Sequence, residues 1–453
     1  MADRNLTTTD KKLLKRASPT VIETSLTELR RFVRGNNWLG STNRYRQDTI
    51  ERLRSDLDPN KRSTVNDRNL RQYIAASGPI HCLDGWGFLG RAMISHVQGD
   101  LDVSRHLAYY AELRAAMALL AMQGVGIFSA QHMLVDANGT CIRFGKSLKT
   151  HEVAWLVLDH WSGLTRSMDV LSTAISPYGI PFANWLDAFG AGTLLRPMAS
   201  EWFTRWGLDL KHFSYDRDAR NESSYRPTKI ATRDHISAIG ISKFLAAFWR
   251  TYEPATSYQP VVLDRHLLRQ GIESAFEALF DKKPVNEPAD FETRVKKMIE
   301  SLNPPGAPAE VLLNFLMRLS EPDTNVILEE ASRITKLQDP RHHLQVMSRA
   351  VLLLRVATGA CGELFQKAGY KRSDLEFWWQ DLGKNLGFWD NSNLPDNLTD
   401  LWGDVEDVLS SLEQWISDYD QQNPSMFTFK SNKNSNLDVL SSCERIGLWG
   451  LGF

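Results

Sequence analysis

The densest run of hydrogen-bonding side chains in the sequence is SYDRDARNESSYRPTKI, from Ser214 to Ile230. It combines Arg, Asp, Asn and Tyr with short hydroxyl side chains, which favour turns and helix ends over helix interiors. Pro227 cannot continue a helix, so we expect a loop or a helix end here. This composition makes the segment the best candidate for a polar functional site.

The motifs of nucleotide and metal chemistry are absent from the sequence. There is no GxxxxGK[ST], no GxGxxG after a predicted strand, no HExxH and no GxSxG. His342 and His343 are adjacent, so on a helix their side chains diverge and do not make an i, i+4 metal pair. The four cysteines are scattered without a CxxC, which favours reduced thiols over a zinc ribbon or a disulfide framework. We therefore expect no metal and no cofactor.

The overall composition is that of a globular protein large enough for two or three domains. The chain has 453 residues, 42% of them hydrophobic and 24% charged, with a formal net charge of −1. No apolar run reaches the roughly 18 residues of a membrane span, and the polar start MADRNLTTTDKK does not read as a signal peptide. We expect a cytoplasmic protein without membrane contact.

Positive charge is concentrated near the N-terminus, where residues 1–76 hold 16 Lys and Arg against 9 Asp and Glu. Such clusters bind phosphates, so this segment permits a nucleic-acid or acidic partner. The alternative is a solvated helical face. Aromatic residues are too sparse there to indicate a platform for stacking bases. The candidate nucleic-acid-binding residues are Arg30, Arg31, Arg34, Arg44 and Arg46.

The most readable helix is Arg105–Phe128, which is rich in Ala, Leu and Met. Its apolar residues recur at spacings of three and four, which predicts a buried helix at the centre of its domain. We expect Asp102 or Ser104 to cap its N-terminus and Gly124 to end it.

The segments on either side of this helix predict a second helix and a hairpin. Residues 77–101 are punctuated by glycine, and we expect a separate helix to begin near Trp86 and to end at Gly99. Residues 133–144 predict a β-hairpin, with an Asn138-Gly139 turn between two short strands.

The predicted fold is mainly α: a multi-helix bundle with one small β-hairpin insertion, followed by a second helical domain. We divide the chain into a basic N-terminal helical segment (1–76), a helical core (77–280), a C-terminal helical domain (291–420) and a tail (421–453). The linker-like DKKPVNEPAD at 281–290 marks the second boundary. The apolar end of the tail, WGLGF, can dock on the body or on a partner, or fray.

Two stretches resemble a known family. HLAYYAELRAAMALLAMQGVGIF, His106 to Phe128, resembles the second long helix of bacterial HEPN-type and YaaC-like helical proteins, and ARNESSYRP, Ala219 to Pro227, resembles their Arg-Asn element. The similarity covers about residues 80–250. It implies a helical bundle and membership of antiphage or toxin–antitoxin loci. Active members are metal-independent ribonucleases with an Arg followed by a His after four to six intervening residues.

The resemblance makes Arg220 and Asn221 candidate catalytic residues, although Tyr225 or Arg226 stands where the family has His. In such a site, His would act as general acid or base toward a ribose 2′-hydroxyl, and Arg would stabilise the phosphorane.

Two further pairs have the family's spacing, Arg91 with His96 and Arg205 with His212. A chain with this many Arg and His residues is expected to contain two such pairs by chance, so the spacing alone does not indicate a catalytic site. The structural alternatives are a helix-end role for His96 and a salt bridge for Arg91.

Two functions from different classes fit these observations. We favour a non-catalytic binding or scaffold subunit of a bacterial antiphage-type defence complex, which bridges an enzyme partner from the same locus and nucleic acid. The alternative is a HEPN-type metal-independent ribonuclease effector. A histidine within hydrogen-bonding reach of Arg220, in a cleft open to solvent, would favour the second. The oligomeric state stays open.

Overall fold

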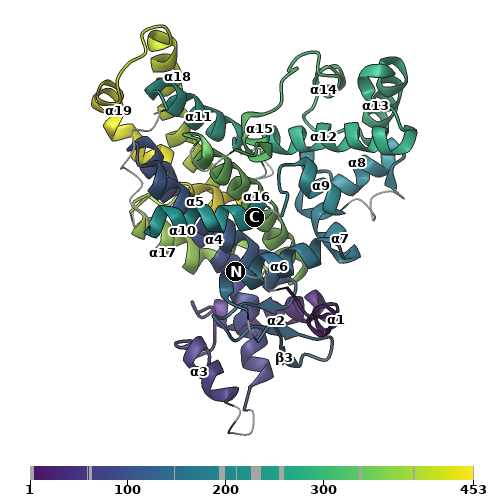
Figure 1. The fold of residues 1–453 in the computed structure, drawn as a ribbon, viewed down its shortest axis with the longest axis vertical. Coiled ribbons are helices and arrows are strands. Elements are labelled where there is room, and N and C mark those ends of the chain that lie inside the picture. The colour runs from purple at the N-terminus through teal and green to yellow at the C-terminus, as the bar shows by residue number, and fades with distance from the viewer. Residues whose placement is uncertain are drawn as a thin grey trace.

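The computed structural model describes residues 5–58, 60, 64–146, 148–192, 199–210, 212–225, 236–254, 260–335, 339–390 and 393–451. These residues form a mainly α-helical protein with one small antiparallel sheet, which confirms the predicted fold class. Figure 1 shows long helices at the centre, two helical arms on one side, and the N-terminal helices with the sheet at the opposite end.

The N-terminal half contains α1 (Thr8–Leu14), α2 (Pro19–Val33), α3 (Thr49–Asp56), α4 (Asp67–Val97), α5 (Leu101–Met122), β1 (Val125–Gly126), β2 (Met133–Val135), β3 (Cys141–Arg143), α6 (Thr150–Ser162), α7 (Thr165–Ala174), η1 (Pro177–Gly179), α8 (Phe182–Phe189), α9 (Ala199–Arg205) and α10 (His212–Tyr225). The C-terminal half contains α11 (Ala238–Thr251), α12 (Val261–Phe280), η5 (Pro284–Asn286), α13 (Pro288–Leu302), α14 (Ala309–Leu316), α15 (Val326–Ser332), α16 (His342–Lys367), η6 (Arg372–Leu375), α17 (Glu376–Asn385), η7 (Leu398–Asp400), α18 (Leu401–Tyr419), α19 (Met426–Ser441) and α20 (Glu444–Leu451).

Helix α5 lies at the centre of the protein, as the Arg105–Phe128 pattern predicts. It packs along α4 and α16 and also contacts α10, α6 and β1. Its N-cap is Asp100, whose side chain accepts a hydrogen bond from the Val103 amide, so the predicted caps Asp102 and Ser104 are wrong. Gly124 follows the last turn with a φ of +82°, a left-handed conformation in which glycine ends a helix at little steric cost.

Helix α4 corrects the prediction for residues 77–101. Instead of a break followed by a new helix near Trp86, one helix runs without interruption from Asp67 to Val97. The glycines inside it allow neighbours to approach closely. A Cβ at Gly85 would lie 2.6 Å from Leu354 Cδ2, and one at Gly90 would collide with the Ser441 carbonyl oxygen. The glycines that suggested a loop therefore serve helix packing.

The buried apolar side chains form one continuous cluster from Leu6 to Leu451. The proposed boundary at residues 76 and 77 falls inside α4. Helix α16, from the proposed C-terminal domain, packs against α5, α4 and α7 of the proposed core. The two predicted helical domains therefore share one core, because α16 fills the space beside α4 and α5.

The predicted hairpin is confirmed, with β2 and β3 joined by a turn in which Gly139 has a φ of +79°. Strand β1 adds a third, two-residue strand that pairs antiparallel with β2. The Asp136 carboxylate accepts hydrogen bonds from the Asn138 and Thr140 amides, which stabilises the turn.

The tail of the chain docks on the body in the described part. Helix α20 packs on α4 and α16 and buries Ile446, Leu448 and Trp449. Helix α19 packs on α18 and α4.

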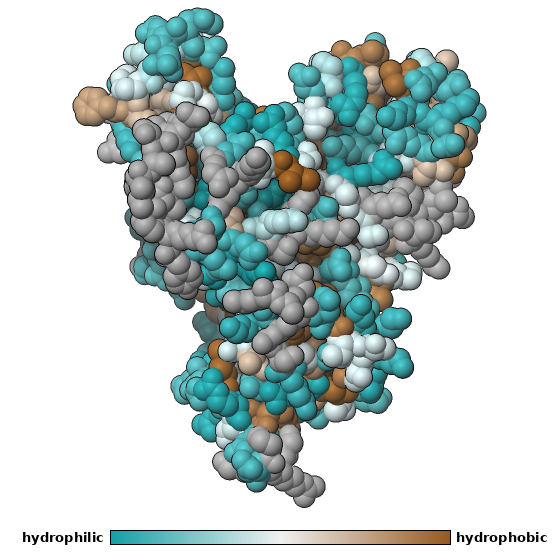
Figure 2. All heavy atoms as spheres, viewed as in Figure 1, coloured by the Kyte–Doolittle hydropathy of each residue, from teal (hydrophilic) through white to brown (hydrophobic). Residues whose placement is uncertain are grey.

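Two arms diverge from the body, one containing α11, α18 and α19 and the other α8, α12, α13 and α14 (Figure 1). The space-filling view shows an open notch between them (Figure 2).

Among the described residues, α16 is the one helix long and apolar enough to cross a membrane, and its apolar window is completely buried inside the protein. This burial is what a central core helix shows.

Candidate functional site

The described part of the polar segment, Ser214 to Tyr225, is helical and forms most of α10, which ends at Tyr225, whereas residues 226–230 lie outside the described residues. The helix crosses α5 and also contacts α6. Phe213 anchors its first turn by stacking on Trp155 of α6, with ring centroids 4.4 Å apart. Asp216, Arg220 and Ser223 follow at spacings of four and three, so they share the face that turns toward α5. Tertiary contacts therefore override the low helix propensity of this polar run.

Arg220 is the centre of a polar and aromatic cluster on this face. Its side chain is largely buried, with 8% of the residue exposed. Nη1 donates to Asn221 Oδ1 at 2.9 Å, and Nη2 donates to the Tyr110 hydroxyl at 3.3 Å. Nη2 also lies 3.2 Å from His151 Nε2, and the guanidinium carbon is 5.5 Å from the ring centre of Tyr109. We call these five residues, with His106, the Arg220 cluster.

The hydrogen bonds of the Arg220 cluster fix the state of His151. A guanidinium is always a donor, so Nε2 of the imidazole must accept from Arg220. Nδ1 lies 3.1 Å from the Tyr109 hydroxyl, which also accepts from Trp155 Nε1 at 3.3 Å. His151 is therefore a neutral imidazole that carries its proton on Nδ1. Burial first, then the charges of Arg220 and Arg217, lower the pKa of His151 to about 4.

His106 extends the Arg220 cluster along α5. Its Nδ1 lies 2.8 Å from Ser224 Oγ of α10, and its ring centre is 5.1 Å from that of Tyr110. Burial and the charge of Arg220 lower the pKa of His106 below its usual value. Tyr110 therefore lies between two imidazoles that are neutral at pH 7, and both are only partly buried.

This arrangement can perform acid–base chemistry on a phosphodiester. A guanidinium stabilises charge on phosphate oxygens, and a neutral imidazole accepts a proton from a hydroxyl. Tyr110 and Asn221, both partly exposed, add neutral hydrogen-bonding groups beside Arg220. His151 was not anticipated, because it follows Thr150 at the start of a helix 69 positions from its partner, and no local pattern connects them.

Of the other candidate catalytic pairs, Arg91 and His96 are both described, and they do not come together. Arg91 is exposed with its guanidinium over the Phe88 ring, whereas His96 is fully buried on another face of α4. His96 Nδ1 lies 2.8 Å from His343 Nε2, which makes it a core residue. Arg205 donates to Ser274 Oγ at 2.7 Å on α12. The side chains of His212 and Tyr225, and residue Arg226, lie outside the described residues.

Most of the candidate nucleic-acid-binding arginines make contacts within the protein. Arg30 and Arg34 of α2 both contact the carboxylate of Asp374, at 3.4 and 3.2 Å. Arg44 forms an ion pair with buried Asp56 at 2.5 Å. Arg44 is therefore offset by a carboxylate of its own, whereas Arg30 and Arg34 share one.

Three of these arginines, Arg31, Arg34 and Arg46, are exposed. Arg46 donates to Asn37 Oδ1 at 2.9 Å, and Arg31 lies over the Phe32 ring. All three stay accessible to a phosphate backbone.

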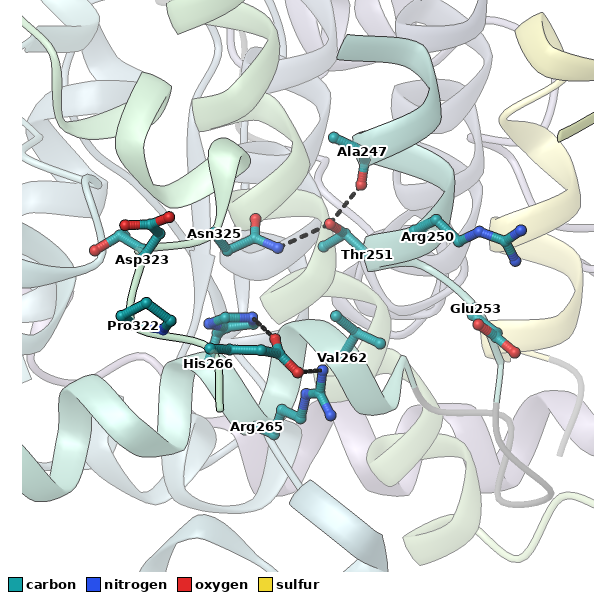
Figure 3. A pocket seen from close by; sticks show the side chains of 12 residues that line it. Ala247, Arg250, Thr251, Glu253, Val262, Arg265, His266, Pro322, Asp323 and Asn325 are labelled. Atoms are coloured by element: carbon teal, nitrogen blue, oxygen red, sulfur yellow. Dashed lines mark hydrogen bonds and ion pairs between the residues drawn. The ribbon is translucent and has the colours of Figure 1, made fainter. Parts of the chain in front are cut away.

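A pocket of about 500 Å³ lies between the end of α11, the start of α12 and the loop before α15. Figure 3 shows Asn325 pointing toward Thr251, with His266 and Arg265 lying beside each other on α12. Its lining includes Arg250, Thr251, Arg265, His266, Glu321 and Asn325.

The two arginines of this pocket are already paired with carboxylates. Arg250 binds both Glu406 and Glu413, and Arg265 binds Glu321 at 2.7 Å. Burial and the neighbouring arginines lower the pKa of His266 to about 3, so this ring is neutral. Sequence reasoning missed the pocket because its walls come from segments far apart in the chain. With its guanidiniums neutralised, the pocket is a weaker candidate for phosphate chemistry than the Arg220 cluster.

Within the described ranges, no group of three or more His, Cys, Asp or Glu side chains is arranged to hold a metal ion. Comparison of the chain with family models, with curated proteins and with solved structures finds no match. The chemistry of the site must therefore be argued from its own residues.

Proposed function

We propose that the protein is a metal-independent ribonuclease effector of the HEPN type, with the Arg220 cluster as its active site. The observation that supports this proposal is the contact between Arg220 Nη2 and His151 Nε2 at 3.2 Å, on a surface where His151, His106 and Tyr110 remain partly exposed. The resemblance of Ala219–Pro227 to the Arg-Asn element of that family agrees with the same residues.

In the proposed reaction, an RNA phosphate replaces His151 as the partner of Arg220. The exchange releases the lone pair of His151 Nε2, which removes the proton from the ribose 2′-hydroxyl. The 2′-oxygen attacks the adjacent phosphorus while Arg220 stabilises the charge of the phosphorane. The bond to the 5′-oxygen breaks, that oxygen takes up a proton from solvent water, and His151 returns its proton to the solvent. The products are a 2′,3′-cyclic phosphate and a 5′-hydroxyl.

The test is cleavage of RNA by the full chain in the presence of EDTA. Arg220→Lys and His151→Gln are expected to lower the rate by about 100-fold or more, because each removes one element of phosphoryl-transfer catalysis. Arg294→Ala is the control, since Arg294 pairs with Asp290 on exposed α13. Absence of cleavage in every RNA offered, or full activity of His151→Gln, contradicts the proposal.

A second candidate is the binding or scaffold subunit that bridges an enzyme partner and nucleic acid. The notch between the two arms favours it, because a concave surface with a pocket between α11 and α12 suits an inserted segment (Figure 2). This function predicts a stoichiometric complex with a protein from the same locus and no loss of function in His151→Gln. A monomer without such a partner in its native host contradicts it.

The biological setting rests on the resemblance alone. It places the proposed activity in the cytoplasm of a bacterium, in an antiphage or toxin–antitoxin locus with a protein partner.

A further inference from the structure

Glu112 is a fully buried carboxyl group at the place where α5, α10 and α16 meet. Arg349 of α16 lies beside it, with Nε 3.7 Å from Glu112 Oε1. The same guanidinium holds Asp216 of α10 through two hydrogen bonds, at 2.9 Å from Nε and 2.7 Å from Nη2. Two buried carboxyl groups therefore face a single guanidinium. We call these three residues the buried triad.

Among the described neighbours of Glu112, Arg349 is the cation that acts on its carboxyl group. Arg349 Nη1 donates to the Ala331 carbonyl at 3.3 Å, at the end of α15. Arg105, two turns before Glu112 on α5, donates to Asp102 and to Ser223 of α10. On α16, burial lowers the pKa of His342 to about 4, so that ring is neutral.

Two buried carboxylates that face one guanidinium would leave a net negative charge inside the protein, which favours a proton on one of them. As a carboxylate, Glu112 would accept no hydrogen bond from the described residues. As a carboxylic acid, it carries no buried charge and has a proton to share with Asp216, which faces the same guanidinium. Burial, and after it the negative charge of Asp216, raise the pKa of Glu112 well above its usual value. With that proton, the buried triad is neutral overall.

We infer that the proton shared by Glu112 and Asp216 over Arg349 holds α10 against α5 and α16, and that its loss at higher pH releases this helix. Asp216 is one turn before Arg220 on α10, and Glu112 is three positions after Tyr109 on α5. The buried triad therefore lies next to the Arg220 cluster along the interface between α5 and α10. By holding α10 at this interface, the triad positions Arg220 beside His151. Its role in catalysis, though not in helix docking, rests on the proposed ribonuclease function.

A second buried ion pair in the chain provides a matched control. Arg355 of α16 holds Asp264 of α12 through two hydrogen bonds at 2.8 and 2.6 Å, and both residues are as buried as the triad. Here one carboxylate faces one guanidinium, and Asp264 also accepts from the Ser176 amide. This pair needs no shared proton, so its helix is expected to stay docked over the same pH range.

The experiment is hydrogen exchange of the full chain at a series of pH values from neutral upward, corrected for the intrinsic rate. Protection of α10 is expected to fall with rising pH, by up to about tenfold per pH unit for one coupled proton. Protection of α12 around Asp264 is expected to stay constant. Glu112→Gln keeps the shape and the donor but cannot ionise, so its α10 protection is expected not to vary with pH. Asp216→Asn, which leaves Glu112 alone with Arg349, is expected to remove the pH dependence as well.

Two results would overturn the inference: protection of α10 that is constant with pH in the native chain, or an identical pH dependence in Glu112→Gln. A parallel loss of protection in α12 would also contradict it, because the effect would then be global. The same variants separate docking from catalysis. If cleavage is observed, Glu112→Gln is expected to keep activity to higher pH than the native chain. If no cleavage is found, the exchange result still stands by itself.

Discussion

Arg220 on α10 and His151 on α6 are 69 positions apart in the sequence, and their side chains meet with Nη2 3.2 Å from Nε2. A guanidinium beside an imidazole is stable only if the ring is neutral, because two cations at this distance repel. The pair therefore sets the proton on Nδ1 of His151 and leaves Nε2 as the basic atom, 3.2 Å from the cation that would bind phosphate.

The first prediction concerns this proton. His151 is expected to remain a neutral Nδ1–H tautomer at pH 7, with a pKa near 4, because burial and Arg220 oppose its protonation. Replacement Arg220→Gln is expected to raise the pKa of His151 toward its ordinary value. Nitrogen chemical shifts of labelled histidine rings, followed across pH, measure both the tautomer and the pKa. Titration of His151 near pH 6.5 in the native chain would contradict the assignment.

The second prediction concerns the close approach at α4. Gly90→Ala places a methyl group against the Ser441 carbonyl, and we expect a loss of about 1–3 kcal/mol in the free energy of unfolding. Gly403 in exposed α18 has no atom within 4 Å of an added Cβ, so Gly403→Ala is expected to gain about 0.5–1 kcal/mol. Denaturant unfolding of the two variants makes the comparison. Equal effects would mean that helix propensity, rather than packing, decides the result.

The sequence predicted the elements whose signals are local. Helix α5 follows from its apolar spacing, and the hairpin follows from Asn138-Gly139, because both depend on residues a few positions apart. The error at α4, and the helical form of the described polar residues of α10, arose where tertiary packing reversed a local preference. Glycines in α4 meet neighbouring chain segments, and the polar residues of α10 meet partners on α5.

Only part of the candidate site could be predicted from the sequence. Arg220 and Asn221 were selected, and the structure places them in one cluster. His151 and Tyr109 could not be selected, since their role depends on how α5, α6 and α10 cross. The buried triad could not be predicted from the sequence either, because nothing near Glu112 in the sequence distinguishes a buried carboxyl group from a solvated one.

The third prediction concerns the end of the chain, whose sequence is compatible with docking and with fraying. Trp449 of α20 is 1% exposed and lies against Trp249 and Trp402, so Trp449→Ala is expected to cost about 3–5 kcal/mol of unfolding free energy. Phe427, one helix earlier, is 80% exposed, and Phe427→Ala is expected to change stability by less than about 0.5 kcal/mol. Thermal unfolding distinguishes the two. A tail that frays would make both substitutions equally mild.

The fourth prediction concerns acid. His96 and His343 are fully buried and their rings are hydrogen bonded at 2.8 Å. Burial lowers the pKa of His96 to about 3, whereas the unfolded chain titrates near 6.5. Because the folded pKa lies below the unfolded one, the stability contribution is complete above about pH 6.5 and is lost as pH falls toward the folded value.

For His96 alone, this loss is expected to reach about 2.5 kcal/mol between pH 6.5 and pH 4.5, since each pH unit in that window costs about 1.4 kcal/mol per proton. His96→Gln cannot titrate, so its unfolding free energy is expected to fall less steeply with acid than that of the native chain. Lys12→Gln, on an exposed helix face, removes a charge without removing a buried ring and is expected to keep the native slope. Denaturant unfolding at several pH values gives the three slopes. If His96→Gln keeps the native slope, the acid sensitivity comes from other groups, and His96 is already protonated or solvated in the folded protein.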